Sequence, residues 1–100
     1  MELEKAAKQL EALGNPTRLA IYRDLIQAGP KGCPVGDIRE KREIPASTLS
    51  HHISKLLQAE LITQDRVSRS LVCRADFINM DALMVFMVHN CCADDSCMRA

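Results

Sequence analysis

Three cysteines lie close together near the end of the chain, at Cys91, Cys92 and Cys97. A thiolate is both a nucleophile and a soft metal ligand, so such a cluster is typical of metal binding or thiol redox chemistry. If residues 93–96 loop back, the three sulfurs converge. Three sulfurs without a fourth ligand suit the trigonal pyramid of trivalent arsenic and antimony, because a lone pair takes the fourth corner of these ions. The sequence therefore predicts an As(III) or Sb(III) site here.

Other uses of the three thiols stay open. Zinc and cadmium prefer four ligands and would need His89 or Cys33 in addition, whereas Cu(I) and Hg(II) also bind soft thiolates. Exposed neighbouring cysteines oxidise readily, so a redox or persulfide switch is the main alternative. Because a disulfide between adjacent residues would be strained, such a switch would pair Cys97 with Cys91 or Cys92.

The two remaining cysteines lie elsewhere. Cys73 follows Val72 in a predicted strand and is expected to be a small buried hydrophobe. Cys33 lies in a loop rich in Gly and Pro and is expected to be incidental, although it could add a ligand from a partner subunit. Whether either residue takes part in the thiol site is left open.

The composition predicts a small cytoplasmic protein. The chain has no apolar run near the ~20 residues of a membrane span and no secretory leader, so no membrane partner is expected. In a reducing compartment, five cysteines are expected to be ligands or redox thiols rather than a disulfide framework. The 100 residues predict one domain over 1–100, with a cysteine-rich tail at 91–100.

A second group of polar residues is typical of nucleic-acid recognition. The stretch PASTLSHHISKL interleaves polar and cationic side chains with apolar ones at helical spacing. At the front of a helix in the major groove, such side chains reach base edges and phosphates. The alternative is that Ser47 and Thr48 only cap the helix and that the histidines are ordinary surface or core residues. The candidate DNA-binding residues are Ser47, Thr48, Ser50, His51, His52 and Lys55 on this helix, and Arg66 and Arg69 on the hairpin that follows.

Apolar spacing and Gly or Pro breaks predict the elements that hold these residues. Helices are expected at 1–13, 17–28, 34–41, from a turn at 43–47 through Leu57, and at 76–90. Strands are expected at 60–65 and 70–74, with a hairpin tip at 66–69. This order is that of a winged helix-turn-helix, so the predicted fold class is mainly α with a β-hairpin wing. The residues expected on one inward face of the first helix are Leu3, Ala6, Ala7, Leu10 and Leu13.

The last predicted helix is apolar on more than one face. Its apolar residues include Phe77, Ile78, Leu83, Met84 and Val85. A helix of this kind needs a partner beyond its own core, and a chain of this size buries only a modest core. The sequence therefore predicts a homodimer through the first and last helices.

The formal net charge is zero, but the charges are unevenly placed. Residues 41–74 hold six Lys or Arg against three Asp or Glu, whereas residues 75–100 hold one base against four acids. A basic middle is typical of a surface that docks an anion such as DNA, and chance scatter over a short chain is the alternative.

Two stretches resemble the ArsR/SmtB family of metal-responsive repressors. Residues 12–21, ALGNPTRLAI, resemble the opening motif of the family, and residues 45–56 resemble its recognition helix. Residues 60–62, followed by Arg66 and Arg69, are similar to its wing. The resemblance covers nearly the whole chain. It implies a homodimeric winged-helix repressor whose inducer lowers its affinity for double-stranded operator DNA.

The chain departs from the two best-known effector sites of that family. Where many arsenic or cadmium sensors carry a Cys-Val-Cys box, this chain has Pro34, Val35 and Gly36. Asp81 and His89 do not reproduce the zinc pattern of the last helix. The usual Gly at the wing tip is also replaced, by Ser68.

The resemblance also bears on the inducer. Some arsenite repressors of the family carry three C-terminal cysteines in a similar arrangement, which supports As(III) or Sb(III) at Cys91, Cys92 and Cys97.

An enzyme is not expected, because no Gly-rich phosphate or oxyanion loop accompanies the thiols. The operator sequence, the regulated genes, and the choice among arsenite, antimonite, organoarsenicals, other soft metals and oxidants do not follow from the sequence.

Overall fold

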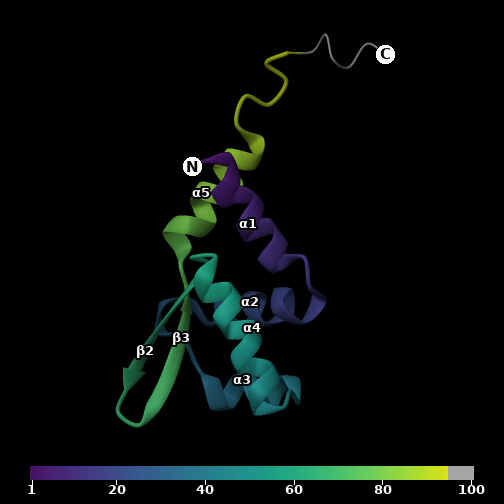
Figure 1. The fold of residues 1–100 in the computed structure, drawn as a ribbon. Coiled ribbons are helices and arrows are strands. Elements are labelled where there is room, and N and C mark those ends of the chain that lie inside the picture. Colours follow the sequence, from purple (N-terminus) through teal and green to yellow (C-terminus); the bar gives the residue numbers. More distant parts are fainter. Residues whose placement is uncertain (95–100) are drawn as a thin grey trace.

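The computed structural model describes residues 1–94 and shows five α-helices with a small sheet (Figure 1). This architecture confirms the predicted mainly helical fold with a β-hairpin wing. None of the helices within residues 1–94 has the length and apolar character that crossing a membrane requires. The elements are α1 (Leu3–Leu13), α2 (Pro16–Ala28), the 3-10 turn η1 (Gly29–Lys31), β1 (Cys33–Pro34), α3 (Val35–Arg42), α4 (Ala46–Gln58), β2 (Ile62–Val67), β3 (Ser70–Ala75) and α5 (Phe77–Val88).

Short polar side chains fix where two of the helices begin. The Asn15 side chain accepts a hydrogen bond from the backbone N–H of Arg18 at 3.0 Å, and Pro16 occupies the first position of α2. Asp76 caps α5 in the same way, accepting from the backbone N–H of Asn79 at 3.0 Å. Both residues satisfy N–H groups that a helix start leaves open, which typically stabilises a helix by about 1 kcal/mol.

The sheet is antiparallel with the order β1-β3-β2, and its first strand was not predicted. Cys33 was placed in a loop, but it lies in β1 directly opposite Cys73 of β3. The preceding Gly32 has φ 72, and a Cβ there would lie 2.4 Å from the Cys73 carbonyl oxygen. Only glycine therefore allows this close approach of the two strands.

The hairpin between β2 and β3 is longer than predicted. A tip at 66–69 was expected, but Arg66 and Val67 still pair with Leu71 and Ser70 across the two strands. The turn therefore contains only residues 68–69, and Ser68 takes a left-handed φ of 58. Glycine adopts this conformation at lower cost than serine, which fits the glycine usual at the wing tip of the ArsR/SmtB family that the sequence resembles.

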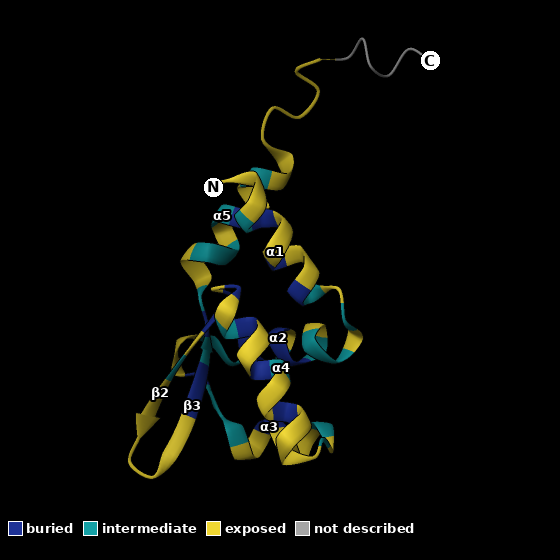
Figure 2. Ribbon diagram, in the orientation of Figure 1, coloured by how far each residue is buried: buried dark blue, intermediate teal, exposed yellow. Residues whose placement is uncertain are grey.

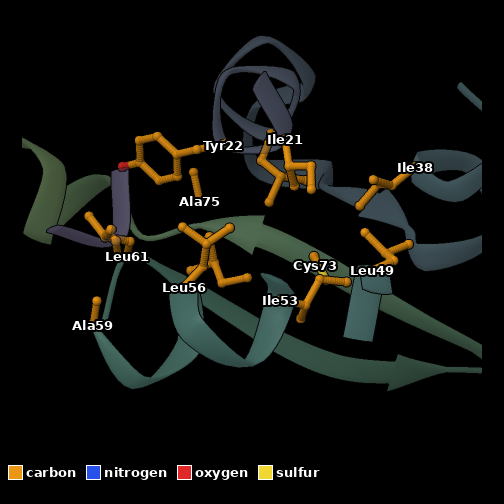
Figure 3. Close-up of a cluster of buried hydrophobic side chains, with 13 residues drawn as sticks. Ile21, Tyr22, Ile38, Leu49, Ile53, Leu56, Ala59, Leu61, Cys73 and Ala75 are labelled. Carbon is orange, nitrogen blue, oxygen red and sulfur yellow. The ribbon is translucent and has the colours of Figure 1, made fainter. Parts of the chain in front are cut away.

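The core lies between the helices and the inner face of the sheet (Figure 3). It confirms the expected burial of Cys73, which is fully buried, and α4 buries its apolar residues Leu49, Ile53 and Leu56. Each buried Leu or Ile contributes roughly 1.5–3 kcal/mol relative to an exposed one. The core residues with 1% exposure or less are Ile21, Tyr22, Leu25, Ile38, Leu49, Leu56, Leu61, Cys73 and Leu83, together with Ala6.

Two helices leave apolar side chains outside this core (Figure 2). On α1 the expected inward face is wrong in part, because Leu3 is 68% exposed and Leu10 is 42% exposed. Gln9 is buried instead, and its Nε2 donates to the Ala59 carbonyl at 3.1 Å. On α5 the only buried residue is Leu83, whereas most of the other apolar side chains are exposed. A single chain therefore leaves the apolar surface of α1 and α5 open to a partner.

Candidate DNA interface and thiol site

The helix-turn-helix consists of α3 and α4. A left-handed Glu43 (φ 53) ends α3, and the backbone N–H of Ile44 closes the turn on the Arg39 carbonyl at 3.2 Å. Leu49, Ile53 and Leu56 face the core from α4. Because residues three and four apart share one face of a helix, most of the other side chains of α4 lie away from the core, and most residues of α4 are coloured as exposed in Figure 2.

The structure brings six of the predicted DNA-binding residues together on that outer face. Ser47, Thr48, Ser50, His51 and Lys55 are exposed, and His52 is half-buried. The helix begins after Pro45, which offers no side-chain cap. Ser47 and Thr48 therefore do not act as caps at the N-terminal cap position, and the first N–H groups of α4 point outward, where the helix dipole favours a phosphate.

His52 is held by a residue from another helix. Nη1 of Arg18 lies 3.3 Å from Nδ1 of His52, while Nε of Arg18 donates to the Ala12 carbonyl at 2.7 Å. Because the guanidinium only donates, Nδ1 acts as the acceptor and the proton of the neutral ring lies on Nε2. Burial, the Arg18 charge and His51 lower the pKa of His52. The ring therefore presents a neutral N–H donor near neutral pH.

The basic middle of the chain divides into paired and unpaired cations. Lys41 and Arg42 both bind Asp24, and Arg74 binds Asp65. Lys55, Arg66 and Arg69 are exposed and make no ion pair with any residue among 1–94. The unpaired cations are thus those on α4 and at the end of the wing, where sequence analysis predicted contact with DNA.

Asp24 joins α2 to the helix-turn-helix. Its side chain is 8% exposed, and its two carboxylate oxygens accept from Nη2 and Nε of Arg42, both at 2.7 Å. The hydrogen bond from Arg42 is the main cause that lowers the pKa of Asp24, against a smaller opposing effect of burial. This two-point geometry fixes α3 on the core and so sets the position of α4.

The tail thiols lie just beyond α5. The chain leaves the helix through two turns, in which Cys91 N–H donates to the Val88 carbonyl at 3.0 Å and Cys92 takes a φ of 63. The Sγ atoms of Cys91 and Cys92 are exposed and 3.5 Å apart. The third predicted ligand, Cys97, lies outside the described residues. Within residues 1–94, no group of three His, Cys, Asp or Glu side chains is placed to hold a metal ion.

The other two cysteines form a separate pair at the sheet. Cys73 is buried, Cys33 is half-buried, and burial is the main cause that raises the pKa of each thiol. Their register across β1 and β3 places Cys33 in a strand rather than in the expected loop, and whether Cys33 takes part in the thiol site stays a prediction.

The sequence did not reveal the residues that hold the helices of the candidate DNA interface in place, as opposed to those on its exposed surface. Arg18 was noted only within the motif PTRL, and Asp24 was not singled out. Their partners lie 34 and 18 residues away along the chain. Periodicity does not predict contacts over such separations. The one local signal was Asp24 itself, because a carboxylate on a helix that packs against the core needs a cationic partner.

Comparisons with known proteins agree with this geometry. A family model described as a helix-turn-helix domain matches residues 13–65, which is more than half of the chain. An arsenical resistance operon repressor from Bacillus subtilis (strain 168) is 41% identical over 63 residues, which are 63% of this chain and 58% of the repressor. The chain therefore spans less than two thirds of the length of that relative.

Two solved structures share the fold. An ArsR-like transcriptional regulator from Rhodococcus sp. RHA1 superposes with a TM-score of 0.76 at 18% identity, covering 91% of this chain and 82% of that chain. The homodimeric winged helix-turn-helix DNA-binding domain of a possible ArsR-family transcriptional regulator from Mycobacterium bovis gives 0.69 at 23% identity, covering 98% and 86%. None of these three names is that of an enzyme. The chain belongs to the helix-turn-helix domain family, and its fold is that of the winged helix-turn-helix structures described above.

Proposed function

We propose that this chain is a homodimeric repressor that binds operator DNA and releases it when As(III) or Sb(III) binds the tail cysteines. The observation that carries the DNA-binding part is the outer face of α4. Its inner face is buried, while Ser47, Thr48, Ser50, His51 and Lys55 are exposed at a helix start that carries no side-chain cap. In a winged helix-turn-helix, this helix enters the major groove and the wing follows the backbone.

Each half of the interface has a separate task. Ser50 and His51 lie on the first turns of α4, from which short hydrogen-bonding side chains reach base edges. Lys55, Arg66 and Arg69 are exposed cations without an ion-pair partner among residues 1–94, and they suit phosphates. The first group would supply sequence preference, and the second group would supply salt-dependent affinity.

The apolar surface of α1 and α5 supports the homodimer. Ile78, Val85 and Val88 are 83%, 63% and 66% exposed, which is an unfavourable arrangement for an isolated chain. A second copy that covers this surface would place two α4 helices for half-sites about 34–36 Å apart, one turn of the double helix. The proposed repressor would act in the cytoplasm, the compartment predicted from the sequence.

The tail thiols fit a thiophilic metalloid as inducer. Cys91 and Cys92 offer two exposed sulfurs 3.5 Å apart, directly after α5. Soft thiolates favour soft ions, and Cys97 would complete a three-sulfur set. The 41% identical relative is named as an arsenical resistance operon repressor, which supports the same chemistry. Binding would act on the end of the dimer helix, and a coupling of ~1–3 kcal/mol between inducer and DNA would suffice for release.

A titration of DNA release tests this proposal. Labelled promoter DNA is bound by the chain, and fluorescence anisotropy is followed against As(III), Sb(III), Cd(II), Zn(II) and peroxide. We expect As(III) and Sb(III) to release the DNA. Cys91→Ser, Cys92→Ser and Cys97→Ser should each lose this response while binding the DNA as before, and Cys33→Ser should keep it as the matched control.

Two outcomes would reject the assignment. If the serine variants still released DNA on arsenite, the metalloid would bind elsewhere. Release by peroxide alone, with no effect of arsenite or antimonite, would favour the alternative of a thiol redox or persulfide switch. Release by Cd(II) or Zn(II) alone would indicate a four-ligand metal site instead.

A further inference from the structure

Cys33 and Cys73 face each other across neighbouring antiparallel strands. They are register partners in the β1–β3 pair, so their side chains leave the sheet on the same face. Facing residues of such a pair have Cα atoms about 4.5–5.5 Å apart. Disulfides span Cα separations of about 4.4–6.8 Å, so the backbone is already within range.

Both thiols are free and occupy an apolar wall of the core. Cys73 points from β3 toward Ile53 and Leu49 (Figure 3), and the half-buried Cys33 packs against the same cluster. Each sulfur has only a weak polar neighbour. Cys33 Sγ lies 3.6 Å from the Pro34 carbonyl oxygen, and Cys73 Sγ lies 3.6 Å from Gln64 Nε2. No strong polar contact therefore holds either sulfur in place.

A surface cavity gives access to this pair from one side. It has a volume of about 580 Å³ and is formed by α2, η1, β1 and α3. Cys33 and Val72 line it, and the exposed Lys31 and Lys41 also contribute to its wall. Cys73 is fully buried behind the strand pair. A small reagent would therefore meet Cys33 first. The wall of the cavity carries Asp24 and Asp37 beside the two lysines, so its charges balance.

We propose that Cys33 and Cys73 form a dithiol site that a small disulfide reagent, such as glutathione disulfide, converts into an intrachain disulfide. The Cys33 thiolate attacks one sulfur of the reagent, forms a mixed disulfide and releases one thiolate. The Cys73 thiolate then attacks Cys33 Sγ, forms the Cys33–Cys73 bond and releases the second thiolate. The two cysteines lose two electrons and two protons in total, and the reagent leaves as two thiols.

The bond would connect the two DNA-facing parts of the fold. Cys33 directly precedes Pro34 and α3, the first helix of the helix-turn-helix, while Cys73 belongs to the wing. Closing the bond needs a Cβ separation near 3.5–4.5 Å, against about 4.5–5.5 Å for facing strand residues. The start of α3 would thus be pulled toward β3, so that the angle between α4 and the wing changes.

The thiol environment adds a kinetic signature. Burial raises the pKa of both thiols, and the neighbouring Cys33 adds to the raised pKa of Cys73. Only the thiolate reacts, so oxidation should become faster as the pH rises above neutral.

Mass spectrometry tests the pair independently of DNA. In the full chain with Cys91, Cys92 and Cys97 replaced by serine, only Cys33 and Cys73 remain of the five cysteines. This variant is incubated with glutathione disulfide, blocked and digested with trypsin. Cleavage after Lys or Arg places the two cysteines on the separate peptides 32–39 and 70–74. We expect these two peptides to appear as one linked species that dithiothreitol separates.

A matched variant shifts one thiol by a single residue. Cys73→Ala combined with Val72→Cys in the same background moves the second thiol to the opposite face of β3. We expect this variant to stop at the mixed disulfide on Cys33, without a linked species. The absence of linked peptides in the Cys33/Cys73 chain, whether Cys33 carries glutathione or stays unmodified, would overturn the proposal. Equal linkage in the shifted variant would overturn it as well, because the register would then play no part.

The effect on DNA rests on the proposed function and is measured separately. The oxidised Cys33/Cys73 chain should bind promoter DNA more weakly than its reduced form, with recovery in dithiothreitol. Cys33→Ser in the same background should show no such change. Unchanged affinity of the linked chain would reject the coupling to DNA. Failure of the reduced chain to bind DNA at all would instead reject the proposed function.

Discussion

The helix-turn-helix end and the α5 end of this molecule differ in how far a single chain pairs its own charges and buries its own apolar side chains. At the first end, Asp24 pairs with Arg42 and Lys41, and the inner face of α4 is buried, so the exposed side chains of α4 are mainly polar. At the second end, α5 buries Leu83 and leaves Ile78, Val85 and Val88 exposed. Beyond this helix the chain presents the free thiols of Cys91 and Cys92.

Under the proposed function, this difference separates DNA recognition at the first end from dimerisation and inducer response at the second. A surface that must read DNA repeatedly benefits from a fixed backbone, because each contact then costs little conformational entropy. A surface that must respond to a second copy and to an inducer has to leave binding energy unused in the isolated chain. Substitutions at one end therefore test how far dimerisation and DNA binding depend on each other.

The largest effect is expected from a charge in the apolar surface of α5. Val85→Asp places a carboxylate on a side chain that is 63% exposed in one chain and would be covered in the dimer. An unpaired buried charge opposes association strongly, while the isolated chain tolerates it. We expect mostly monomer in analytical ultracentrifugation and loss of specific operator binding.

The same substitution on the wing serves as the control. Val67 is 49% exposed and lies on β2, away from α5. Val67→Asp should remain dimeric under the same conditions. If Val85→Asp were also dimeric, the α5 surface would not be the dimer interface, and the contrast between the two ends would disappear.

The next effect concerns the unpaired cations of the wing. Arg66→Gln with Arg69→Gln removes two exposed charges that pair with no acid among residues 1–94. Operator affinity should fall, and the slope of log K against log salt should become shallower by about 0.9 for each phosphate that is no longer neutralised. Arg23→Gln, an exposed cation on α2, should leave the slope unchanged. Equal slopes for both variants would place the wing away from the DNA.

A smaller effect is expected on folding stability at the helix-turn-helix end. Arg42→Ala removes both hydrogen bonds to the 8% exposed Asp24 and leaves only Lys41 near that carboxylate. Hydrogen bonds to charged groups contribute about 1.5–3 kcal/mol, so urea unfolding should show a loss in this range. Arg39→Ala, an exposed residue on the same helix, should change stability by no more than about 0.5 kcal/mol.

The acid limb of the same measurement identifies Asp24 as the cause. The pKa of Asp24 is lowered in the folded chain, so the folded state holds fewer protons there than the unfolded state. The contribution is complete above the ordinary Asp pKa of about 3.9 and is lost as the pH falls through the folded pKa. Arg42→Ala should therefore lose less stability than the wild type over this acid range. A parallel acid decline in both chains would contradict this explanation.

Sequence patterns predicted the parts of the molecule that local periodicity controls. The spacing of Leu49, Ile53 and Leu56 predicted the inner face of α4 because residues three and four apart share a helix face. It could not predict β1, since a two-residue strand forms only through its partner β3, some forty residues later. On α1, spacing placed Ala6, Leu3 and Leu10 on one inward face, but Ala6 is buried while Leu3 and Leu10 are exposed, so spacing alone did not identify the side that meets the core.

The candidate site shows the same division. The polar face of α4 and the wing arginines were visible in the sequence because they form local runs of one chemical kind. Their role on DNA stays a prediction, as does the role of the tail cysteines, of which Cys97 lies outside the described residues. The contact between Arg18 and His52 was not predictable, because the fold alone brings together residues separated by 34 positions.

The smallest effect concerns this contact and its pH dependence. The pKa of His52 is lowered by burial first, then by Arg18 and His51, so the folded chain holds fewer protons there than the unfolded chain. The stabilising contribution is complete above the ordinary His pKa of about 6.5 and declines as the pH falls through the folded pKa. Arg18→Gln removes one cause, so the folded pKa rises toward its ordinary value and the acid decline becomes shallower.

Urea unfolding is compared at about pH 7.5 and about pH 5.5, which lie on either side of the ordinary His pKa. Arg18→Gln also loses the hydrogen bond to Ala12 and should be less stable at both pH values. The informative quantity is therefore the difference in unfolding free energy between the two pH values, which should be smaller than in the wild type. His52→Gln should show a smaller difference still, because burial continues to act on the ring in Arg18→Gln. If the wild type, Arg18→Gln and His52→Gln all lost the same stability on acidification, Arg18 would not influence the protonation of His52.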